Sequence, residues 1–593
     1  MAIRTVNDIF LSLVARNLPR VMMRKEGDSW VPISCQDLYR SVRGTAHALQ
    51  EWGIAKGDRV AILSENRPEW AIADFAALLI GAITVPVYAT LTEQQAAFLL
   101  GDSGARLMFV SSEKQLEKVL AIQPQTSIQK IVVMDDVKTS LAFPMRRLMT
   151  EEPPQVDSQL EDKARAISPD DPASIIYTSG TTGTPKGAVL THGNLAANIT
   201  HSLTGFDIGP NDVSVSFLPL SHVTARHADY ALFYRGATLA YCPFFEEVPH
   251  ALREVKPTIF VAVPRVYEKI YNQAVQSTKA FPKNAVYKWA LSVGREAKPE
   301  TLAGRQPRRV AWKLADKLVF SKIREGMGGR ARLYVSGGAP LGRELAEWYA
   351  AIGIRIHEGY GLTETSPVIA VNNPRDHKIG TVGKTLTNVE IRFAEDGELL
   401  VRGPSVFAQY WNRPEETDAA FIDGWFKTGD IGNIDADGFL SITDRKKDLI
   451  KTSGGKFIAP QPLESSLKHN ALVSEAIVVG DRRKFPAVLI VPDFALLEQW
   501  ARENQLAFSS RADLVSSPHV RALYDSMVHS LNENLARFEK LKKFIIIGEE
   551  FSSENGMLTP SMKLRRRVVE ERYRAQIEAL YFQTEVEVPV RPN

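Results

Sequence analysis

Residues 177–187 read YTSGTTGTPKG, and this segment restricts the fold more than any other in the sequence. Apolar runs at residues 174–177 and 188–191 enter and leave it, so the pattern predicts a loop between two strands. Glycine allows several backbone N–H groups to converge on one anion, while the hydroxyl groups and Lys186 add donors and a positive charge. The segment therefore predicts a loop that wraps a polyphosphate.

This loop differs from the Walker A pattern, in which glycine directly precedes the lysine and Ser or Thr follows it. Here Pro185 precedes Lys186 and Gly187 follows it, which disfavours a P-loop kinase. A flexible surface linker is the alternative interpretation. Linkers rarely place a single lysine after Gly-Thr-Pro between two apolar strands, so we prefer the phosphate loop.

The sequence around the loop alternates helix-like and strand-like segments. Residues 41–52 and 69–79 have the pattern of helices, and residues 59–63, 83–88 and 106–110 are short apolar strands. Such alternation is typical of a mainly parallel sheet covered by helices. Three Asp-Gly pairs between residues 396 and 438 then mark turns between shorter strands. We expect an α/β fold whose large N-terminal domain also carries a β-rich layer.

The pattern changes after DRKKD at residues 444–448, a segment too charged for a core. A hairpin at residues 475–479 and 487–491 follows, and then long amphipathic segments at residues 494–504 and 526–541. We therefore expect a smaller, mobile α+β C-terminal domain. The predicted domains are residues 1–444 and 445–593.

Composition excludes several classes of protein. The chain of 593 residues is 44% apolar and 24% charged, and its net charge of +3 does not suggest a nucleic-acid partner. Two cysteines, Cys35 and Cys242, cannot build a disulfide framework, and the N-terminus lacks a signal-peptide pattern, so we expect a cytoplasmic protein. The most apolar stretch, residues 75–89, contains Pro86 and is shorter than the roughly 20 residues that span a bilayer. Any membrane contact is therefore expected at the surface, without a transmembrane segment.

Five motifs resemble those of the AMP-forming acyl-CoA synthetases, the family that also includes firefly luciferase and the adenylation domains of peptide synthetases. In family order they are TSGTTGTPKG at 178–187, YGLTET at 360–365, WFKTGD at 425–430, DRKKD at 444–448 and LTPSMKLRR at 558–566. Further segments are similar to the long-chain fatty acyl-CoA synthetase branch: FLPLSHV at 217–223, VPRVYEKI at 263–270 and SGGAPL at 336–341. The resemblance covers nearly the whole chain.

This resemblance implies a two-step ligase. A fatty acid carboxylate attacks the α-phosphate of ATP to give acyl-AMP and pyrophosphate, and the thiol of coenzyme A then gives acyl-CoA and AMP. ATP, CoA and a long-chain fatty acid are the implied substrates, and Mg²⁺ the implied cofactor. The alternatives are a fatty acyl-AMP ligase that loads a carrier protein, a ligase for a medium-chain or aryl acid, an oxidative luciferase, or a non-catalytic nucleotide-binding protein. Peripheral membrane contact and a homodimer stay open.

The resemblance assigns ATP-binding roles to residues that match the family motifs. The β- and γ-phosphates would be held by Thr178, Ser179, Gly180, Thr181, Thr182, Gly183, Thr184 and Lys186. Around the adenine, which would stack on Tyr360, the site would include Gly338, Ala339, Glu358, Gly359, Tyr360 and Gly361.

The remaining nucleotide contacts are carried over in the same way. Thr363 would contact the α-phosphate, and Glu364 would hold Mg²⁺, an ion that takes one or two protein carboxylates beside phosphates. Asp430 and Arg445 would bind the ribose hydroxyls. The structural alternatives are a helix-start acid for Glu364, a core aromatic for Tyr360 and a turn residue for Asp430.

Catalysis is implied for Lys563 and His222, together with Thr363. Lys563 would bridge the attacking carboxylate and the α-phosphate during adenylation, and His222 would lie between the acyl pocket and the thiol path. The alternatives are one cation of a solvated basic helix for Lys563 and a packed histidine for His222.

The family also rotates its small domain between the half-reactions, here about Lys447. Gly454 and Gly455 would then help to form the pantetheine channel. Thr224 and Ala225 replace the aromatic residue and glutamate that the family often has before the arginine. This departure leaves the entrance of the acyl tunnel, and with it the preferred chain length, open.

Overall fold

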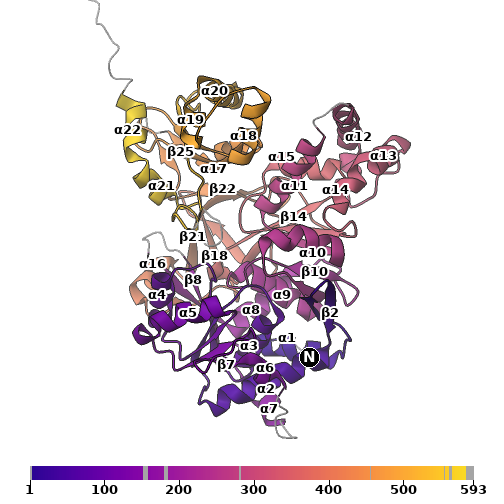
Figure 1. Cartoon of the computed structure of the whole chain (residues 1–593), viewed down its shortest axis with the longest axis vertical. Helices are drawn as coiled ribbons and strands as arrows, with labels where there is room; N and C mark the ends of the chain where they lie inside the picture. The colour runs from indigo at the N-terminus through magenta and orange to yellow at the C-terminus, as the bar shows by residue number, and fades with distance from the viewer. Residues whose placement is uncertain are drawn as a thin grey trace, which may run out of the picture. The chain divides into compact units, whose positions relative to one another are not determined.

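In the computed structural model of the chain, shown in Figure 1, the described residues are 3–150, 158–178, 184–278, 282–453, 456–533, 535–552, 554–559 and 564–582. They form two compact units. The large unit comprises residues 1–392, 400–428 and 434–440, and the small unit comprises residues 393–399, 429–433 and 441–593. Each unit has hydrophobic clusters of its own. The expected domain boundary at residues 444 and 445 stays a prediction.

The first sheet of the large unit has nine strands. Neighbouring strands from β14 to β1 run parallel, and antiparallel pairs lie at both edges. In spatial order the strands are β16 (Lys384–Thr385), β15 (Val368–Val371), β14 (Ile356–Gly361), β13 (Leu333–Ser336), β12 (Ile259–Ala262), β10 (Val213–Ser216), β11 (Thr238–Tyr241), β1 (Met22–Glu26) and β2 (Ser29–Ile33).

The second sheet of the large unit has eight strands. From β8 to β7 they are parallel, and β8, β9 and β19 are antiparallel neighbours. In spatial order they are β19 (Gln409–Tyr410), β9 (Lys186–Thr191), β8 (Pro172–Thr178), β4 (Ile83–Val87), β3 (Arg59–Leu63), β5 (Leu107–Val110), β6 (Lys130–Val133) and β7 (Phe143–Pro144). The expected mainly parallel sheets are confirmed.

Helices fill the connections between these strands. They are α1 (Val6–Ala15), α2 (Cys35–Glu51), α3 (Pro68–Leu79), α4 (Glu93–Ser103), α5 (Glu113–Ile122), α6 (Met145–Thr150), α7 (Ser158–Ala166), α8 (His192–Ser202), α9 (Val223–Arg235), α10 (Val248–Val255), α11 (Pro264–Ser277), α12 (Lys283–Leu302), α13 (Val310–Ala315), α14 (Ser321–Glu325), α15 (Arg343–Ala351) and α16 (Pro414–Ala420). Short 3₁₀ turns are η1 (Gln123–Gln125), η2 (Phe245–Glu247) and η4 (Thr363–Thr365), and η3 (Asp316–Phe320) is a π-helix.

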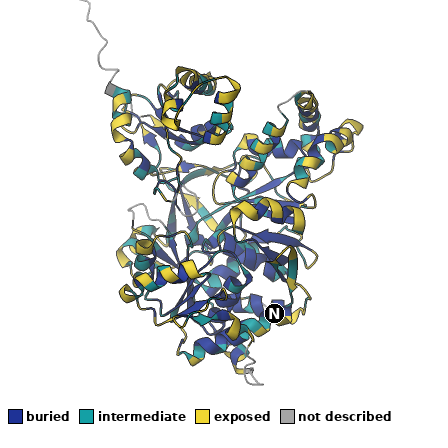
Figure 2. Ribbon diagram, viewed as in Figure 1, coloured by how far each residue is buried: buried dark blue, intermediate teal, exposed yellow. Residues whose placement is uncertain are grey.

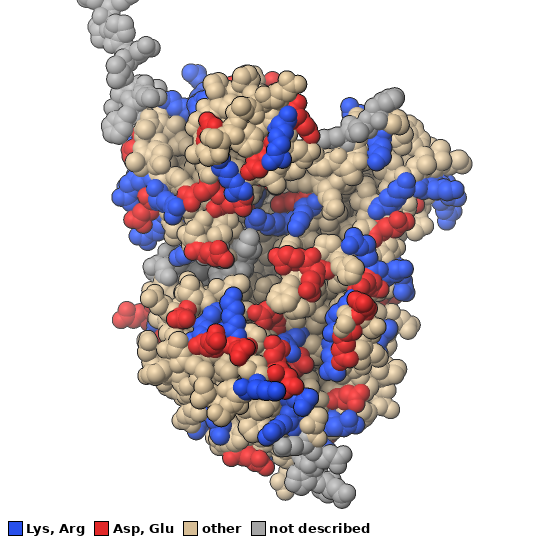
Figure 3. Space-filling model, in the orientation of Figure 1, with Lys and Arg blue, Asp and Glu red and all other residues tan. Residues whose placement is uncertain are grey.

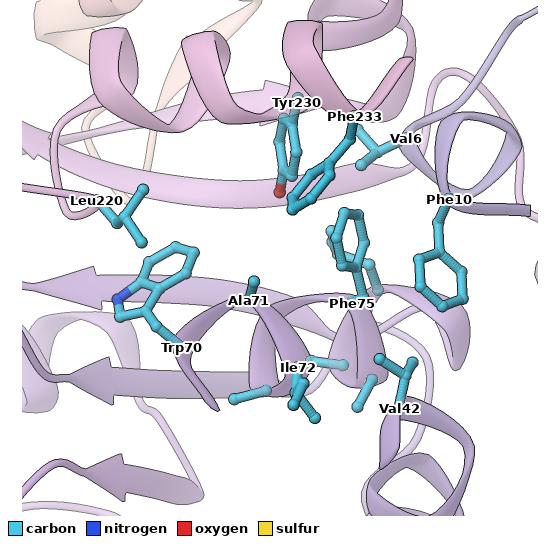
Figure 4. Close-up of a cluster of buried hydrophobic side chains, with 14 of the residues drawn as sticks. Val6, Phe10, Val42, Trp70, Ala71, Ile72, Phe75, Leu220, Tyr230 and Phe233 are labelled. Atoms are coloured by element: carbon cyan, nitrogen blue, oxygen red, sulfur yellow. The ribbon is translucent and has the colours of Figure 1, made fainter. Parts of the chain in front are cut away.

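The apolar stretch at residues 75–89 is a buried helix, α3, followed by the buried strand β4, as expected. Figure 4 shows Phe75 of α3 facing Tyr230 and Phe233 of α9, with Phe10 of α1 beside it. The ring centroids of Phe10 and Phe75 are 4.7 Å apart, and those of Phe75 and Tyr230 are 5.6 Å apart. Burial of such aromatic faces ties α1, α3 and α9 together in a hydrophobic cluster that also includes strands of both large sheets. The central strands of the two large sheets, such as β4, β5 and β10, are fully buried and dark blue in Figure 2.

The β-rich segment contains β17 (Glu390–Phe393), β18 (Glu398–Arg402), β20 (Phe421–Ile422), β21 (Trp425–Ile434) and β22 (Leu440–Arg445). The small unit continues with β23 (Ile450–Lys451), β24 (Phe457–Ile458), α17 (Pro460–Lys468), β25 (Val473–Val479), β26 (Ala487–Pro492), α18 (Phe494–Glu503), α19 (Arg511–Ser516), α20 (Pro518–Glu533), β27 (Phe544–Ile546), α21 (Arg566–Arg572) and α22 (Arg574–Phe582). The expected hairpin is β25 and β26, to which β27 adds in parallel.

The amphipathic segment at residues 526–541 is helical only as far as Glu533. The helix α20 begins at Pro518 and ends at Glu533. The side chain of Asn532 bonds both the N–H and the C=O of Leu541, so the chain turns back rather than continuing as a helix. Among the described residues, no helix combines the length and apolar character that crossing a bilayer requires.

Candidate active site

Several predicted site residues follow the carboxyl ends of neighbouring parallel strands in the nine-stranded sheet. His222 comes after β10, Gly338 and Ala339 after β13, and Thr363 and Glu364 after β14. Parallel strands end at the same edge of a sheet, and open α/β sheets bind their ligands there. The topology therefore brings these three segments to one edge.

Glycine spacing shows how closely these segments approach one another. A Cβ atom on Gly337 would lie 3.8 Å from the Cγ2 atom of Thr224 and 3.8 Å from the carbonyl oxygen of Gly359. Gly338 has φ of +85°, a left-handed conformation that glycine adopts without strain. The start of α9, the turn after β13 and strand β14 thus meet, with Gly338 and Ala339 exposed beside them.

Glu358 holds the turn after β13 in place. Its Oε1 atom accepts a hydrogen bond from the backbone N–H of Leu341 at 3.0 Å. Burial raises the pKa of this carboxyl to about 7, while the bond from Leu341 opposes the rise. The predicted nucleotide residue Glu358 therefore also supports the SGGAPL turn.

Strand β14 requires glycine where it passes β15. A Cβ atom on Gly361 would lie 1.8 Å from the carbonyl oxygen of Pro367, which no side chain tolerates. The pairing shifts register between Tyr360 and Gly361. Tyr360 and, two residues beyond Gly361, Thr363 are half-buried.

The predicted phosphate loop connects the antiparallel strands β8 and β9, as expected. Thr178 and Lys186 are partners across the two strands, and the Thr178 hydroxyl donates to the Lys186 carbonyl at 3.5 Å. Thr184 is exposed. Five residues predicted to bind phosphate lie outside the described residues: Ser179, Gly180, Thr181, Thr182 and Gly183.

Tyr410 connects two predicted site residues that are far apart in sequence. Its hydroxyl donates to the Oε1 atom of Glu364 at 2.9 Å, and the Nζ atom of Lys186 lies 5.4 Å from the centroid of its ring. Burial and the Glu364 carboxylate together raise the pKa of the Tyr410 hydroxyl, so it stays a donor. Sequence reasoning missed Tyr410. The aromatic pair Tyr410–Trp411 was the only local signal.

Strand pairing fixes Tyr410 at this position. Strand β19 runs antiparallel to β9 and places Tyr410 opposite Ala188. The N–H of Trp411 donates to the carbonyl of Gly187 at 2.7 Å, directly after Lys186. The base of the phosphate loop and the Glu364 carboxylate are thus linked through one tyrosine.

His222 lies at the N-terminus of α9, where it caps the helix. Its Nδ1 atom accepts a hydrogen bond from the backbone N–H of Thr224 at 3.1 Å. An acceptor at this position satisfies a helix N–H that has no intrahelical partner. The ring orientation of His222 is therefore set by the start of α9.

One turn further along α9, Arg226 forms a buried cluster. Its guanidinium pairs with Asp74 and donates to the hydroxyls of Tyr230 at 2.8 Å, Ser174 at 2.7 Å and Thr84 at 2.7 Å. Arg226 and Asp74 are almost completely buried. The cluster ties α9 to α3 and β4, and also to β8, four residues before the phosphate loop begins at Thr178.

Within the small unit, the predicted ribose-binding residues lie together. The Nε atom of Arg445 is 3.2 Å from the Oδ1 atom of Asp430. The Asp430 side chain is 2% exposed, whereas that of Arg445 is 45% exposed. Lys446 pairs with Glu398 at 2.7 Å, and Glu398 also accepts the N–H of Gly429 at 3.0 Å. The WFKTGD and DRKKD motifs therefore meet.

Four further predicted residues belong to the small unit: Lys447, Gly454, Gly455 and Lys563. Lys563, Gly454 and Gly455 lie outside the described residues. Leu558 and Leu564, on either side of the predicted catalytic segment, form an antiparallel bridge. Lys447 is exposed.

A two-unit α/β chain with this arrangement has the fold of adenylate-forming enzymes. An anthranilate CoA ligase bound to anthranoyl-AMP superposes with a TM-score of 0.75 at 20% identity, over 98% of this chain and 99% of that one. The adenylation domain of a carboxylic acid reductase from Segniliparus rugosus superposes with a TM-score of 0.73 at 21% identity, over 98% of this chain and 94% of that one.

The chain belongs to the AMP-binding enzyme family. The sequence pattern of AMP-binding enzymes matches residues 14–411, and that of their C-terminal domain matches residues 447–585. A long-chain-fatty-acid–CoA ligase of Mycobacterium tuberculosis, FadD15, is 39% identical over 93% of this chain and 92% of its own. A human long-chain-fatty-acid–CoA ligase, ACSBG1, is 31% identical over 94% of this chain and 82% of its own.

Proposed function

We infer that this protein is a long-chain fatty acid–CoA ligase that forms AMP. It converts a fatty acid and ATP to acyl-AMP and pyrophosphate, and then transfers the acyl group to CoA. The observation that carries this inference is the 39% identity to the mycobacterial ligase over 93% of the chain. The described geometry supports this inference. In the large unit, Tyr410 contacts both Lys186 of the phosphate loop and Glu364 of YGLTET, and in the small unit Asp430 pairs with Arg445.

ATP phosphates are bound by the loop at residues 178–186 in this proposal. Lys186 and Glu364 both contact Tyr410, so this proposal places a cation and a carboxylate beside the phosphates. Glu364 fits a Mg²⁺ ligand, because this ion takes one or two carboxylates and completes its shell with phosphates and water. Bound Mg²⁺ would neutralise charge on the phosphate oxygens.

The nucleoside is bound by two further groups. The adenine stacks on Tyr360 between β14 and the exposed turn Gly338–Ala339, with Glu358 holding that turn. Asp430 accepts hydrogen bonds from the ribose hydroxyls, and Arg445 fixes the orientation of its carboxylate. A buried acid paired with a half-exposed arginine suits this role, because an ionised carboxylate accepts several hydrogen bonds at once.

The reaction needs charge neutralisation more than covalent chemistry. Thr363 donates to the α-phosphate, and Lys563 bridges the α-phosphate and the attacking carboxylate. His222 borders the path of the CoA thiol, with its ring held by the start of α9. Gly454 and Gly455 serve the thioester step after the small unit moves about Lys447.

The partners proposed are a long-chain fatty acid, ATP and CoA, without nucleic acid. Contact with a membrane surface fits a substrate that partitions into lipid. A cytoplasmic location and a homodimer stay open proposals.

Nucleotide chromatography after turnover with palmitate, ATP, Mg²⁺ and CoA tests the function. AMP and pyrophosphate should form in equal amounts with palmitoyl-CoA, and ADP would overturn the assignment.

A panel of saturated acids from acetate to arachidate should show kcat/KM rising with chain length, since each buried methylene contributes about 0.8 kcal/mol. An optimum at acetate or an aryl acid would overturn the long-chain assignment. Replacing CoA with acyl carrier protein separates a ligase from a carrier-loading enzyme.

The variant Lys563→Ala divides the two half-reactions. Adenylation should fall by about 10²–10³-fold, the scale for removing one charge-stabilising group, while thioester formation from supplied acyl-AMP persists. Arg567→Ala is the matched control, because it removes an exposed cation of the same segment. Equal losses in both half-reactions would contradict the proposed role.

A further inference from the structure

A row of apolar side chains is exposed on one helix of the large unit. Residues 310–325 form a continuous helix made of α13, the π-helix η3 and α14. Val310, Leu314 and Leu318 are 83%, 49% and 44% exposed. Because they are spaced four residues apart, they lie on the same side of the helix.

The opposite side of this helix anchors it to the core. Trp312, Val319 and Phe320 are buried in a hydrophobic cluster of the large unit. The exposed row is therefore not an unfolded or loosely attached segment. The exposed row itself does not stabilise the fold, because apolar side chains stabilise a protein only when they are removed from water.

Cations flank the exposed row. Arg309, Lys313, Lys317 and Lys322 are all exposed on the same helix or immediately before it. Figure 3 shows blue Lys and Arg side chains gathered over the region where Figure 1 labels α13 and α14, beside a tan surface. Among the described residues, no carboxylate lies within ion-pair distance of Lys313, Lys317 or Lys322.

The helix carries little opposing charge near these lysines. Asp316 pairs with Arg324 at 2.5 Å, and Arg309 pairs with Glu296 of α12 at 3.2 Å. Lys313 and Lys317 therefore present positive charge to solvent next to Leu314 and Leu318.

We propose that this surface binds an anionic lipid bilayer. We define the α13–α14 face as Val310, Leu314 and Leu318 with Arg309, Lys313, Lys317 and Lys322. An apolar row bordered by lysines is the pattern of a helix that lies in a membrane interface, with its apolar side chains at the acyl boundary. The lysine stems extend along the apolar surface and place their ammonium groups at the lipid headgroups.

The composition of this face favours lipid over a protein partner. Protein interfaces are depleted in lysine and enriched in aromatic residues at their centres. Here the cations beside the apolar row are mainly lysines, and the row itself is Val310, Leu314 and Leu318. Neighbouring α12 exposes Trp289, a residue type that concentrates at the membrane interface.

The chain connects this face to the predicted site. The helices α11 to α14 fill the connection between β12 and β13, two paired parallel strands. Val263 follows β12 and its Cγ1 atom lies 3.8 Å from the Cβ position of Gly338, which follows β13. The α13–α14 face thus belongs to a helical connection that leaves from and returns to the sheet bearing the predicted site residues.

Vesicle co-sedimentation of the full chain tests the proposal without requiring catalysis. Phosphatidylcholine vesicles that contain phosphatidylglycerol should bind the wild-type protein, pure phosphatidylcholine vesicles should bind it more weakly, and added salt should weaken the first. Lys313→Glu/Lys317→Glu should weaken binding by on the order of 30-fold or more, since each basic residue near an anionic surface contributes about a fivefold factor and the variant reverses both charges. Val310→Ser/Leu314→Ser should also weaken it.

Matched controls separate this face from general charge and hydrophobicity. Lys114→Glu/Lys163→Glu makes the same charge change at exposed lysines of α5 and α7, and Leu141→Ser removes a side chain that is 65% exposed. Both should bind as the wild type does. The proposal would be overturned if the wild-type protein did not bind anionic vesicles, or if test and control variants lost vesicle binding equally. So would a dimer in sedimentation that only the test variants disrupt, because the face would then bind a second copy. If vesicles bind but no acyl-AMP forms, the proposed function fails and the lipid surface stands.

Discussion

The Arg226 cluster and the α13–α14 face both rest on basic side chains, and they use the charge in opposite ways. Arg226 is buried, and Asp74 with three hydroxyl groups accounts for its guanidinium donors. Lys313 and Lys317 are exposed, and no described carboxylate pairs with them. A satisfied buried charge stabilises one arrangement of the fold, whereas an exposed unpaired charge is available to a partner. Substitutions in the Arg226 cluster should therefore lower the free energy of unfolding, whereas substitutions on the α13–α14 face should change binding and leave stability nearly unchanged.

The largest effect is expected from Asp74→Ala. This variant leaves the Arg226 guanidinium buried without its carboxylate, which costs about 3–5 kcal/mol in the free energy of unfolding. Urea denaturation followed by tryptophan fluorescence measures it, because every tryptophan except Trp500 lies in the large unit. Asp74→Leu/Arg226→Met should lose less than Asp74→Ala alone. A double variant that loses more would show that the pair stabilises the fold by itself.

A second buried carboxyl in the same region predicts a pH dependence. Asp229 accepts a hydrogen bond from Ser216 at 3.0 Å, and burial raises its pKa to about 7. The folded protein keeps this proton up to about pH 7, while the unfolded chain loses it near pH 4. The contribution of Asp229 to stability is therefore present below pH 4 and is lost as the pH rises toward 7.

The variant Asp229→Asn should remove that loss. Relative to the wild type, its free energy of unfolding should rise by about 2–3 kcal/mol between pH 5 and pH 8. Urea titrations at a series of pH values measure the difference. A difference that does not change with pH would mean that Asp229 is ionised in the folded protein.

The smallest effect on stability is expected at the α13–α14 face. Lys313→Glu/Lys317→Glu should change the free energy of unfolding by less than about 0.5 kcal/mol, because exposed side chains without fixed partners contribute little. The same urea assay provides the measurement. A decrease in the free energy of unfolding as large as that of Asp74→Ala would show that these lysines stabilise the fold, as the Arg226 cluster does.

Local pattern predicted much of the fold. The alternation of apolar strands and helices identified the parallel sheets, and the run at residues 75–89 identified α3 and β4. The strand–loop–strand structure of the phosphate loop also follows from local sequence. These features depend on residues that are close in the chain, where periodicity and turn residues carry the information.

Contacts between distant residues were not predictable in this way. Tyr410 reaches Glu364 across 46 residues, and Arg226 reaches Asp74 across 152 residues. Neither pair has a spacing that a helix or strand period would indicate. The end of α20 is likewise not a matter of local periodicity, because the side chain of Asn532 turns toward Leu541 there.

The place of Tyr410 has a consequence for the charge state of the site before substrate arrives. Lys186 and Glu364 have opposite charges, and two such groups in direct contact would neutralise each other and would have to separate again for each turnover. Instead, the ammonium group lies over the face of the Tyr410 ring, and the Tyr410 hydroxyl donates to the carboxylate; among the described residues, no ion pair joins Lys186 to Glu364. In the proposed function, where Lys186 binds phosphate and Glu364 holds Mg²⁺, the nucleotide therefore meets both charged groups without first breaking an ion pair between them.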